Sequence, residues 1–346
     1  MHQLYNKEKN MLSCWLSLMC FAVIIVIFIG GLTRLTESGL SITEWKPVSG
    51  IIPPIDSDSW SVEFEKYKQS PEYIKNNSGM SMTEFKSIYM LEFCHRLAGR
   101  IIGLLYVLPL IFFFLKGNIT GRKAGAYIVV LILFLCQGAV GWYMVQSGLV
   151  SDPHVSHFRL ASHLILAIFI YMILFWQLMN NSFDIMLLPS NKPLCGLSFW
   201  AILSIVLLLL QMILGAFVAG LQAGLVYNSF PLMGDSFVPH EISLTTLSLS
   251  SWSEPVFVQF IHRAVAYILF FVICIFSLQG IRLKNSKFSR LICYVMVALT
   301  FQIFTGIFTL ICHVPIPLAL LHQFGAVLLL SFLLWAWFLI QNSRSL

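Results

Sequence analysis

The sequence predicts an all-α polytopic membrane protein in which eight transmembrane helices form two tandem four-helix bundles. Hydrophobic residues occupy 58% of the 346 positions and charged residues only 10%, whereas a soluble domain carries about 25% charged residues. Eight apolar runs are long enough to cross a bilayer, and motifs of the first half recur in the second. The composition therefore excludes a soluble globular protein.

The apolar runs define the predicted transmembrane helices. A helix needs about 20 apolar residues to cross the hydrocarbon core. Runs of this length span residues 12–32, 93–115, 124–146, 159–179, 195–219, 258–280, 289–311 and 317–340. No small-residue cleavage site or arginine-rich transit peptide precedes the first run. We therefore expect that run to be retained, in a bacterial cytoplasmic membrane.

Basic residues predict the topology. They gather before the first run and in three short loops: Lys7, Lys9, Lys116, Arg122, Lys123, Lys192, Arg282, Lys284, Lys287 and Arg290. These positions share one side of the membrane, which the positive-inside rule makes cytoplasmic. We therefore expect both termini to be cytoplasmic and residues 33–91 and 220–256 to be external. The net charge of +6 thus reports topology and gives no indication of nucleic-acid binding.

The external segment 33–91 is predicted to be an ordered cap. It is rich in aromatic residues and contains an amphipathic stretch from Trp60 to Tyr73. Such a stretch favours short interfacial helices over a flexible linker. Residues 220–256 are predicted to form a second external cap.

The eight cysteines show no pattern of a disulfide or zinc site. None forms a CxxC motif, and no two share one external loop. We expect them to be small buried residues: Cys14, Cys20, Cys94, Cys136, Cys195, Cys274, Cys293 and Cys312.

The two halves of the chain repeat. One constant offset aligns a first set of residues, Gly30, Gly39, Leu40, Trp45 and Pro54, with a second, Gly215, Gly224, Leu225, Phe230 and Pro239. Later matches pair Phe93–Arg96 with Phe260–Arg263, and the residues Gln137, Gly141 and His163 with Gln302, Gly306 and His322. Motifs that recur in one order indicate a parallel duplication. We therefore predict two domains, 1–180 with the long external loop and 181–346.

Four histidines occupy matching places near the outer ends of four predicted helices: His95, His163, His262 and His322. Each precedes a small residue by four positions, in order Gly99, Ala167, Ala266 and Ala326. Two imidazoles from facing helices can ligate a six-coordinate haem iron. The pattern therefore predicts one haem site in each half. The alternative is that each histidine only bonds to a neighbouring side chain. Four further histidines, in or near external loops, lack this pattern and are interpreted as surface or surrounding residues: His154, His157, His240 and His313.

Four arginines lie near the same helix ends: Arg96, Arg100, Arg159 and Arg263. They are candidates for binding haem propionates through charge-assisted hydrogen bonds. The alternative is that they reach along the helices to the membrane surface.

The halves differ at one informative place. Glu92 precedes His95 by three residues, and Gln259 occupies the matching place before His262. A carboxylate can transfer protons or stabilise a cation, whereas an amide does not ionise. We therefore predict a catalytic role for Glu92 and a reactive N-terminal half. The alternative is that Glu92 only pairs with Arg96 one helical turn away.

With these residues described, the chain resembles the haem A synthase family, in its proteobacterial and mitochondrial branch. The resemblance covers nearly the whole chain. Its most specific parts are GGLTRLTESGLSITEWKPVSGIIPP (30–54), FEKYKQSPEY (64–73), EFCHRLAGR (92–100), QGAVGWYMVQSGL (137–149), VSHFRLASHL (155–164) and YNSFPLM (227–233).

The resemblance implies an enzyme that oxidises a ring methyl of haem O to a formyl group, giving haem A for cytochrome aa3-type oxidases. It also implies that His262 and His322 ligate a permanent haem b, that His95 and His163 ligate the substrate haem, and that Glu92 is the essential glutamate. Implied partners are an unidentified electron donor, haem O synthase, cytochrome oxidase assembly factors and further copies of the chain.

Two other functions fit the four histidines. A di-haem b-type electron-transfer cytochrome would use the same ligands, but it does not account for the difference between Glu92 and Gln259. A haem exporter or chaperone would be expected to offer a path to both membrane faces, whereas the predicted ligands gather at one.

Overall fold

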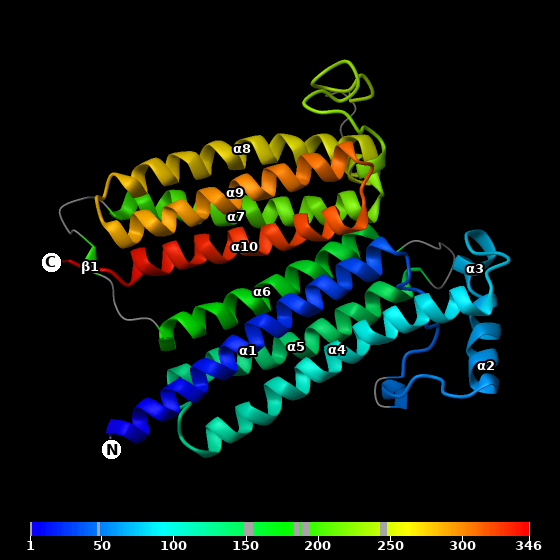
Figure 1. Cartoon of the computed structure of the whole chain (residues 1–346), viewed down its shortest axis with the longest axis horizontal. Helices are drawn as coiled ribbons and strands as arrows, with labels where there is room; N and C mark the ends of the chain where they lie inside the picture. The colour runs from blue at the N-terminus through cyan, green and yellow to red at the C-terminus, as the bar shows by residue number, and fades with distance from the viewer. Residues whose placement is uncertain are drawn as a thin grey trace. The chain divides into compact units, whose positions relative to one another are not determined.

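The computed structural model describes residues 2–46, 49–148, 155–182, 187–188, 194–242 and 248–345. Within them the chain forms eight long helices (Figure 1): α1 (His2–Leu35), α4 (Met82–Leu115), α5 (Arg122–Gln146), α6 (His157–Ser182), α7 (Leu194–Gly220), α8 (Pro255–Ile281), α9 (Ser286–Ile311) and α10 (Ile316–Gln341). Two-residue strands β1 (Leu187–Leu188) and β2 (Arg344–Ser345) pair in parallel. Among the basic residues used to predict the topology, Lys192 lies outside the described residues, as does His154.

All eight long helices contain a segment that is long and apolar enough to cross a membrane. The predicted all-α polytopic membrane class is therefore confirmed. The limits agree closely with the predicted runs except at two helix starts: α1 begins at His2 instead of near residue 12, and α4 begins at Met82 instead of near residue 93. For α4 the reason is local. Ser81 and Glu84 form a capping box, with Ser81 N donating to Glu84 Oε2 at 2.8 Å, and this motif starts a helix well before the apolar run.

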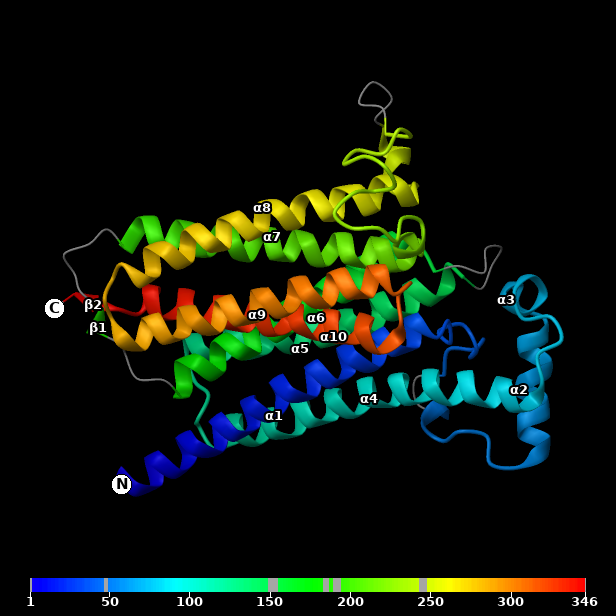
Figure 2. The ribbon, with the colours of Figure 1, turned by 45° about the horizontal axis from the view of Figure 1, so that its top comes forward.

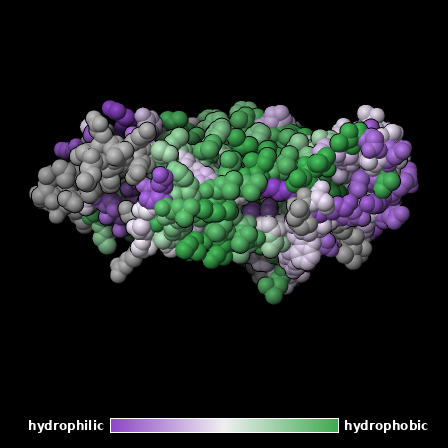
Figure 3. Space-filling model, turned by 90° about the horizontal axis from the view of Figure 1, so that it is seen from below, coloured by the Kyte–Doolittle hydropathy of each residue, from purple (hydrophilic) through white to green (hydrophobic). Residues whose placement is uncertain are grey.

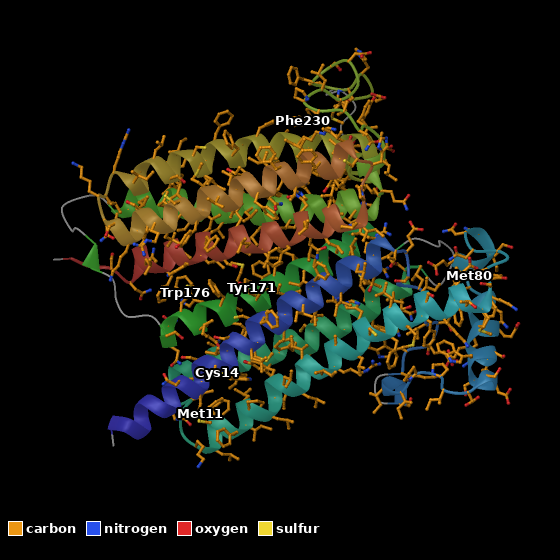
Figure 4. All side chains as sticks on the ribbon, in the orientation of Figure 1. Met11, Cys14, Met80, Tyr171, Trp176 and Phe230 are labelled. Atoms are coloured by element: carbon orange, nitrogen blue, oxygen red, sulfur yellow. The ribbon has the colours of Figure 1, made fainter. Side chains whose placement is uncertain are left out.

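The chain divides into two compact units, Leu18–Ile170 and a unit made of Met1–Ser17 and Tyr171–Leu346. The division falls inside α1 and α6 instead of in a loop. The end of α6 packs on α10: Tyr171 bonds Ser331 at 2.6 Å, and the rings of Trp176 and Trp337 lie 4.9 Å apart (Figure 4). The domain limits 1–180 and 181–346 stay a prediction.

Helices α7 to α10 form a closed four-helix bundle. Helix α7 packs on α8 and α10, and α9 also packs on α8 and α10. Figures 1 and 2 show these four helices running side by side. Leucine, isoleucine, valine and phenylalanine fill the centre, including Leu208, Ile273, Phe276, Ile292 and Leu330. Close packing of such side chains holds a membrane bundle together, because lipid competes equally well for apolar surface.

The unit Leu18–Ile170 joins four helices by specific contacts. The Tyr106 hydroxyl of α4 donates to the carbonyl of Tyr127 on α5 at 2.8 Å. Gly30 of α1 lies against His95 of α4. The face seen in Figure 3 is hydrophobic along the middle of the helices, and hydrophilic residues gather at the end that carries α2 and α3. This distribution suits a bundle whose middle lies in lipid.

The external segment contains η1 (Ser49–Ile51), α2 (Ser57–Lys68) and α3 (Pro71–Lys75). Asp56 is the N-cap of helix α2, and its carboxylate accepts a hydrogen bond from Ser59 N at 2.8 Å, as is usual for this position. Six buried aromatic residues join these helices to the start of α4: Trp60, Phe64, Tyr67, Phe85, Tyr89 and Phe93. Met80 packs on this cluster (Figure 4). The predicted short helices are thus present, and we call this assembly the aromatic cap.

The second segment predicted to be external spans residues 220–256. It contains η2 (Ala223–Leu225) and η4 (Leu249–Ser253), with an isolated bridge between Met233 and Ser236. Phe230 projects from it as an exposed side chain (Figure 4).

The cysteines correct a prediction. All eight are free, but only Cys20 is buried; Cys274 is half-buried and the other six are exposed. In a membrane helix, an apolar neighbourhood in the sequence marks lipid-facing and core positions alike, so the sequence did not distinguish them.

A buried carboxyl lies inside the aromatic cap. Glu72 is 4% exposed, and its Oε2 accepts from the Tyr67 hydroxyl at 3.0 Å, which in turn accepts from Asn77 Nδ2 at 2.7 Å. Burial raises the pKa of Glu72 to about 7; the Tyr67 hydrogen bond lowers that pKa, and the charges of Glu92 and Glu37 raise it further. The folded cap therefore binds a proton that the unfolded segment releases at lower pH.

We predict that the cap loses stability as the pH rises from about 4.5, the ordinary pKa of this carboxyl, to about 7. In this window the folded state holds more protons than the unfolded state, so stability falls with pH; below and above it the dependence disappears. Hydrogen-exchange protection of residues 57–91, corrected for intrinsic exchange at each pH, should decline across the window. Glu72→Gln should flatten the decline, whereas Glu65→Gln, on the exposed face of α2, should leave it unchanged. An unchanged decline in Glu72→Gln would contradict the assignment.

Candidate functional site

His95 of α4 and His163 of α6 both lie in the unit Leu18–Ile170. Helix α4 also carries residues of the aromatic cap. Both histidines are half-buried and interact electrostatically with each other. Each ring lies against a glycine of another helix. A Cβ added to Gly30 of α1 would lie 3.0 Å from Nε2 of His95, and one added to Gly141 of α5 would lie 2.9 Å from Cε1 of His163. These distances leave no room for a side chain at either glycine.

His262 of α8 and His322 of α10 repeat this arrangement in the other unit. They too are half-buried and interact electrostatically. A Cβ added to Gly215 of α7 would lie 3.4 Å from Cε1 of His262, and one added to Gly306 of α9 would lie 2.7 Å from Cε1 of His322. Both pairs are thus arranged alike, and three of the four rings occupy a space kept open by a glycine; Gly215 alone leaves an ordinary contact distance.

Two matching glutamines contact the second histidine of each pair. Gln137 Nε2 lies 3.2 Å from Nδ1 of His163 and donates to the carbonyl of that residue at 3.1 Å. Gln302 Nε2 lies 3.4 Å from Nε2 of His322. Both glutamines stand one helical turn before the glycine that faces the same ring, so a single helix face supplies both contacts.

A third glutamine contacts His262. Gln211 Nε2 lies 3.2 Å from Nε2 of this histidine and donates to its carbonyl at 2.9 Å. The Oε1 atoms of all three glutamines and Nδ1 of His262 are buried and have no hydrogen-bond partner in the part of the chain that the structure describes. Buried polar atoms normally have partners, so these sites contain hydrogen-bonding capacity that the protein alone does not use.

These observations fit a haem in each half. The described residues contain no group of three or more His, Cys, Asp or Glu able to hold a metal ion by themselves. A haem needs only two protein ligands, because the porphyrin supplies four nitrogens. Paired imidazoles on separate helices, with unused ring and amide atoms around them, supply that donor set.

Glu92 lies on α4, 2% exposed, and is fully bonded. Its Oε1 accepts from Nε and Nη2 of Arg96 at 3.1 and 2.6 Å. Its Oε2 accepts from the Ser41 hydroxyl at 2.6 Å and from Ile42 N at 2.8 Å. Four donors suit a carboxylate, which has acceptor atoms only. The ion pair with Arg96 is therefore present, and Glu92 also fixes the start of the external segment beside His95.

The matching contacts in the other unit use an amide. Gln259 Nε2 donates to the carbonyl of Tyr227 at 3.0 Å, and Arg263 Nη2 donates to the same oxygen at 3.0 Å. Tyr227 stands at the place of Ile42 under the repeat offset, and Val226 stands at the place of Ser41. The hydroxyl and the carboxylate are thus replaced together, which leaves the C-terminal half without a carboxylate at this point, although Arg263 is kept.

The four predicted arginines bind backbone carbonyls. Arg96 contacts Ile42 and Glu44 and lies 5.7 Å over the Trp45 ring. Arg100 contacts the carbonyl of Lys46 at 3.0 Å. Both line a small pocket under the external segment, together with Glu63, Tyr89, Phe93 and other residues.

The remaining two arginines are placed similarly. Arg159 donates to the carbonyl of Tyr143 at 2.7 Å and stacks 3.7 Å from that ring. Arg263 contacts Leu232 as well as Tyr227, and its Nε is buried without a partner in the described residues. Binding of propionates by the four arginines stays a prediction.

Sequence reasoning missed the glycines that face the histidine rings. It chose Gly99, four residues after His95, but that glycine is exposed and has open space beside it. The signal was present, since Gly30 and Gly215, and Gly141 and Gly306, are matched by the repeat. What was missing was knowledge of which helices face each other.

Three further residues, His157, Gln222 and Cys94, take no part in the hydrogen bonds described above. His157 is buried beside Phe158. Gln222 has a left-handed backbone (φ 52°) just after α7, and Glu37, its counterpart after α1, has the same φ; this position ends a helix. Cys94 adjoins His95 in sequence but is exposed, so no role follows from its position.

The chain is similar to known proteins along most of its length. The family of cytochrome oxidase assembly proteins COX15-CtaA matches residues 13–334. A protein of Rickettsia bellii named heme A synthase is 51% identical over 336 residues, covering 97% of this chain and all of the relative. Proteins of the same name from Rickettsia felis and Rickettsia conorii are 49% and 48% identical over the same length. A family match over most of the chain, with relatives this similar along their full length, shows that the protein belongs to the COX15-CtaA family.

Proposed function

We propose that this protein is a haem A synthase, a membrane oxidoreductase that oxidises a ring methyl of haem O to a formyl group. The observation that carries the proposal is the pair of half-buried histidines in each half, each ring against a glycine, in a chain that matches relatives named heme A synthase along their full length. Haem O is the substrate and haem A the product.

The two histidine pairs take different roles in this proposal. His262 and His322 hold a resident haem b, which when bound supplies one-electron transfer. His95 and His163 hold the substrate haem. The assignment rests on the family resemblance and on the carboxylate next to only one pair, since Gln259 stands at the place of Glu92 in the repeat.

Glu92 is proposed to act on the substrate side. Its carboxylate lies one helical turn from His95 and is bonded to a serine hydroxyl as well as to Arg96. A buried carboxylate can accept a proton or stabilise a developing positive charge. Because Arg96 and the backbone of residues 42–44 hold it in place, it would act without reorganising.

The setting follows from the predicted topology. Both termini lie in the cytoplasm of a bacterial cell, and the haem sites lie towards the outer face of the cytoplasmic membrane. The reaction needs an electron donor, which the chain does not identify. Haem O synthase is the proposed source of substrate, cytochrome oxidase assembly factors are the proposed recipients of product, and a homo-oligomer is compatible with this scheme.

The first prediction concerns haem content. Acid–acetone extraction and chromatography of the purified protein should give haem b together with haem O or haem A. His95→Ala should lose only the latter, because its own pair loses one ligand while the other pair is intact. Haem b alone in both samples would instead identify a di-haem electron-transfer cytochrome.

The second prediction concerns Glu92. In Glu92→Gln the haem A yield should fall by about 10²-fold or more, the usual contribution of a general acid or base, and haem O or a hydroxylated intermediate should accumulate while bound haem persists. Ser41→Ala is the control, because it removes one donor and keeps the carboxylate. If Glu92 only anchors the external segment, both variants should lose haem alike, and a normal haem A yield in Glu92→Gln would remove its catalytic role.

The third prediction concerns the glycines. Gly141→Val places a side chain where only 2.9 Å separates a Cβ from the His163 ring, so the ring must move and haem in the N-terminal half should be lost. Gly138→Val on the same helix meets open space and should leave the haem content unchanged. The extracted haem per mole of folded protein measures both, and equal content in the two variants would refute the prediction.

A further inference from the structure

His322 is the only one of the four histidines, within the described part of the chain, whose ring meets hydrogen-bond acceptors on its Nδ1 atom. This atom lies 3.1 Å from the carbonyl oxygen of Gln302 and 3.3 Å from Oγ1 of Thr305. The Thr305 hydroxyl donates to the carbonyl of Phe301 at 2.9 Å, so its lone pairs point away from the helix. Two acceptors at Nδ1 fix the tautomer that carries its proton there and leave Nε2 free as a ligand.

His262 has polar surroundings of a second kind. Gln211 contacts its ring and its carbonyl, and Gln211 Oε1 and His262 Nδ1 are both buried without partners in the described residues. One atom is an acceptor and the other carries a proton once Nε2 binds a metal. Gln211 thus holds this histidine through its ring and its backbone at once, although its Oε1 and the His262 Nδ1 do not bond each other in this arrangement.

The N-terminal half lacks both groups. The offset that pairs Gly30 with Gly215 places Val26 opposite Gln211, and the offset that pairs Gly141 with Gly306 places Val140 opposite Thr305. The ring of His163 contacts only the amide of Gln137, and no hydrogen bond reaches the His95 ring from the described residues. Gln137 and Gln302 match each other, so Gln211 and Thr305 are the polar groups in contact with histidine rings that have no counterpart in the N-terminal half.

We infer that Gln211 and Thr305 are positioning residues that act through His262 and His322 to hold the C-terminal haem iron at a lower midpoint potential than valines at these places would allow. An imidazole that donates its Nδ1 proton to an acceptor becomes a stronger donor to the iron and favours the ferric form. The same bonds fix the ring orientation, which suits a haem that stays bound. Rings without such acceptors suit a substrate haem that must be exchanged. The inference rests on the proposed function for the assignment of resident and substrate sites.

The test measures potential, so it does not depend on synthase activity. Haem b is titrated in the His95→Ala protein, which keeps the C-terminal site alone, with and without the double substitution Gln211→Val and Thr305→Val. We expect the midpoint to rise by the equivalent of about a tenfold change in the ferric-to-ferrous ratio, which is about 59 mV for a one-electron couple. Thr305→Ser, which keeps the hydroxyl, should restore the Thr305 part of the shift.

Several outcomes separate the possibilities. An unchanged midpoint in a double variant that keeps a bis-histidine spectrum overturns the inference. If the double variant binds no haem, Thr305→Val alone is titrated, and an unchanged midpoint there has the same meaning. The reciprocal pair Val26→Gln and Val140→Thr, introduced into His262→Ala protein, should lower the potential of the N-terminal haem. If extraction shows only haem b in the wild type, the synthase assignment fails while the titration still decides the role of the two residues.

Discussion

The close approach of a glycine to each histidine ring is the contact on which the site depends. At three of the four glycines an added Cβ would lie between 2.7 and 3.0 Å from the ring, so a side chain does not fit there, whereas at Gly215 it would lie at an ordinary contact distance of 3.4 Å. Small residues at helix contacts are also what let membrane helices approach each other. One residue type therefore serves both packing and ligand placement, and a larger residue there would alter both at once.

The two halves share this arrangement of histidines and glycines, but they differ at pairs of residues. Gln259 and Val226 stand at the places of Glu92 and Ser41 in the repeat, and Gln211 and Thr305 stand at the places of Val26 and Val140. One backbone contact is kept, since Arg96 donates to the carbonyl of Ile42 and Arg263 to that of Tyr227. The other differs, because Glu92 accepts from Ile42 N whereas Gln259 donates to the carbonyl of Tyr227. The carboxylate lies in the N-terminal half, and the additional polar groups at the histidine rings lie in the C-terminal half. This difference supports a division into a reactive half and an electron-carrying half.

The fold class and the candidate ligands could be predicted because they depend on local patterns. A membrane helix can be recognised from the length of its apolar run, and a histidine within such a run is easily noticed. The glycine partners and the acceptors of His322 could not be predicted, because they depend on which helices face each other and on the rotation of each helix. The long α4 was missed for a different reason, since the capping box at Ser81 and Glu84 is a polar signal outside the apolar run. The prediction that the cysteines are buried was wrong, because lipid-facing and core positions of a membrane helix are both apolar in the sequence.

Helix α4 also has a mechanical consequence. It runs without interruption from Met82 in the aromatic cap past His95 into the membrane, and 13 residues of α-helix span about 20 Å. Phe85, Tyr89 and Phe93 bind its outer end into the cap. The cap and His95 therefore lie on one continuous helix, so a tilt of the cap displaces the His95 ring. A protein that binds the cap would act on His95 in this way, although it touches neither histidine of the pair.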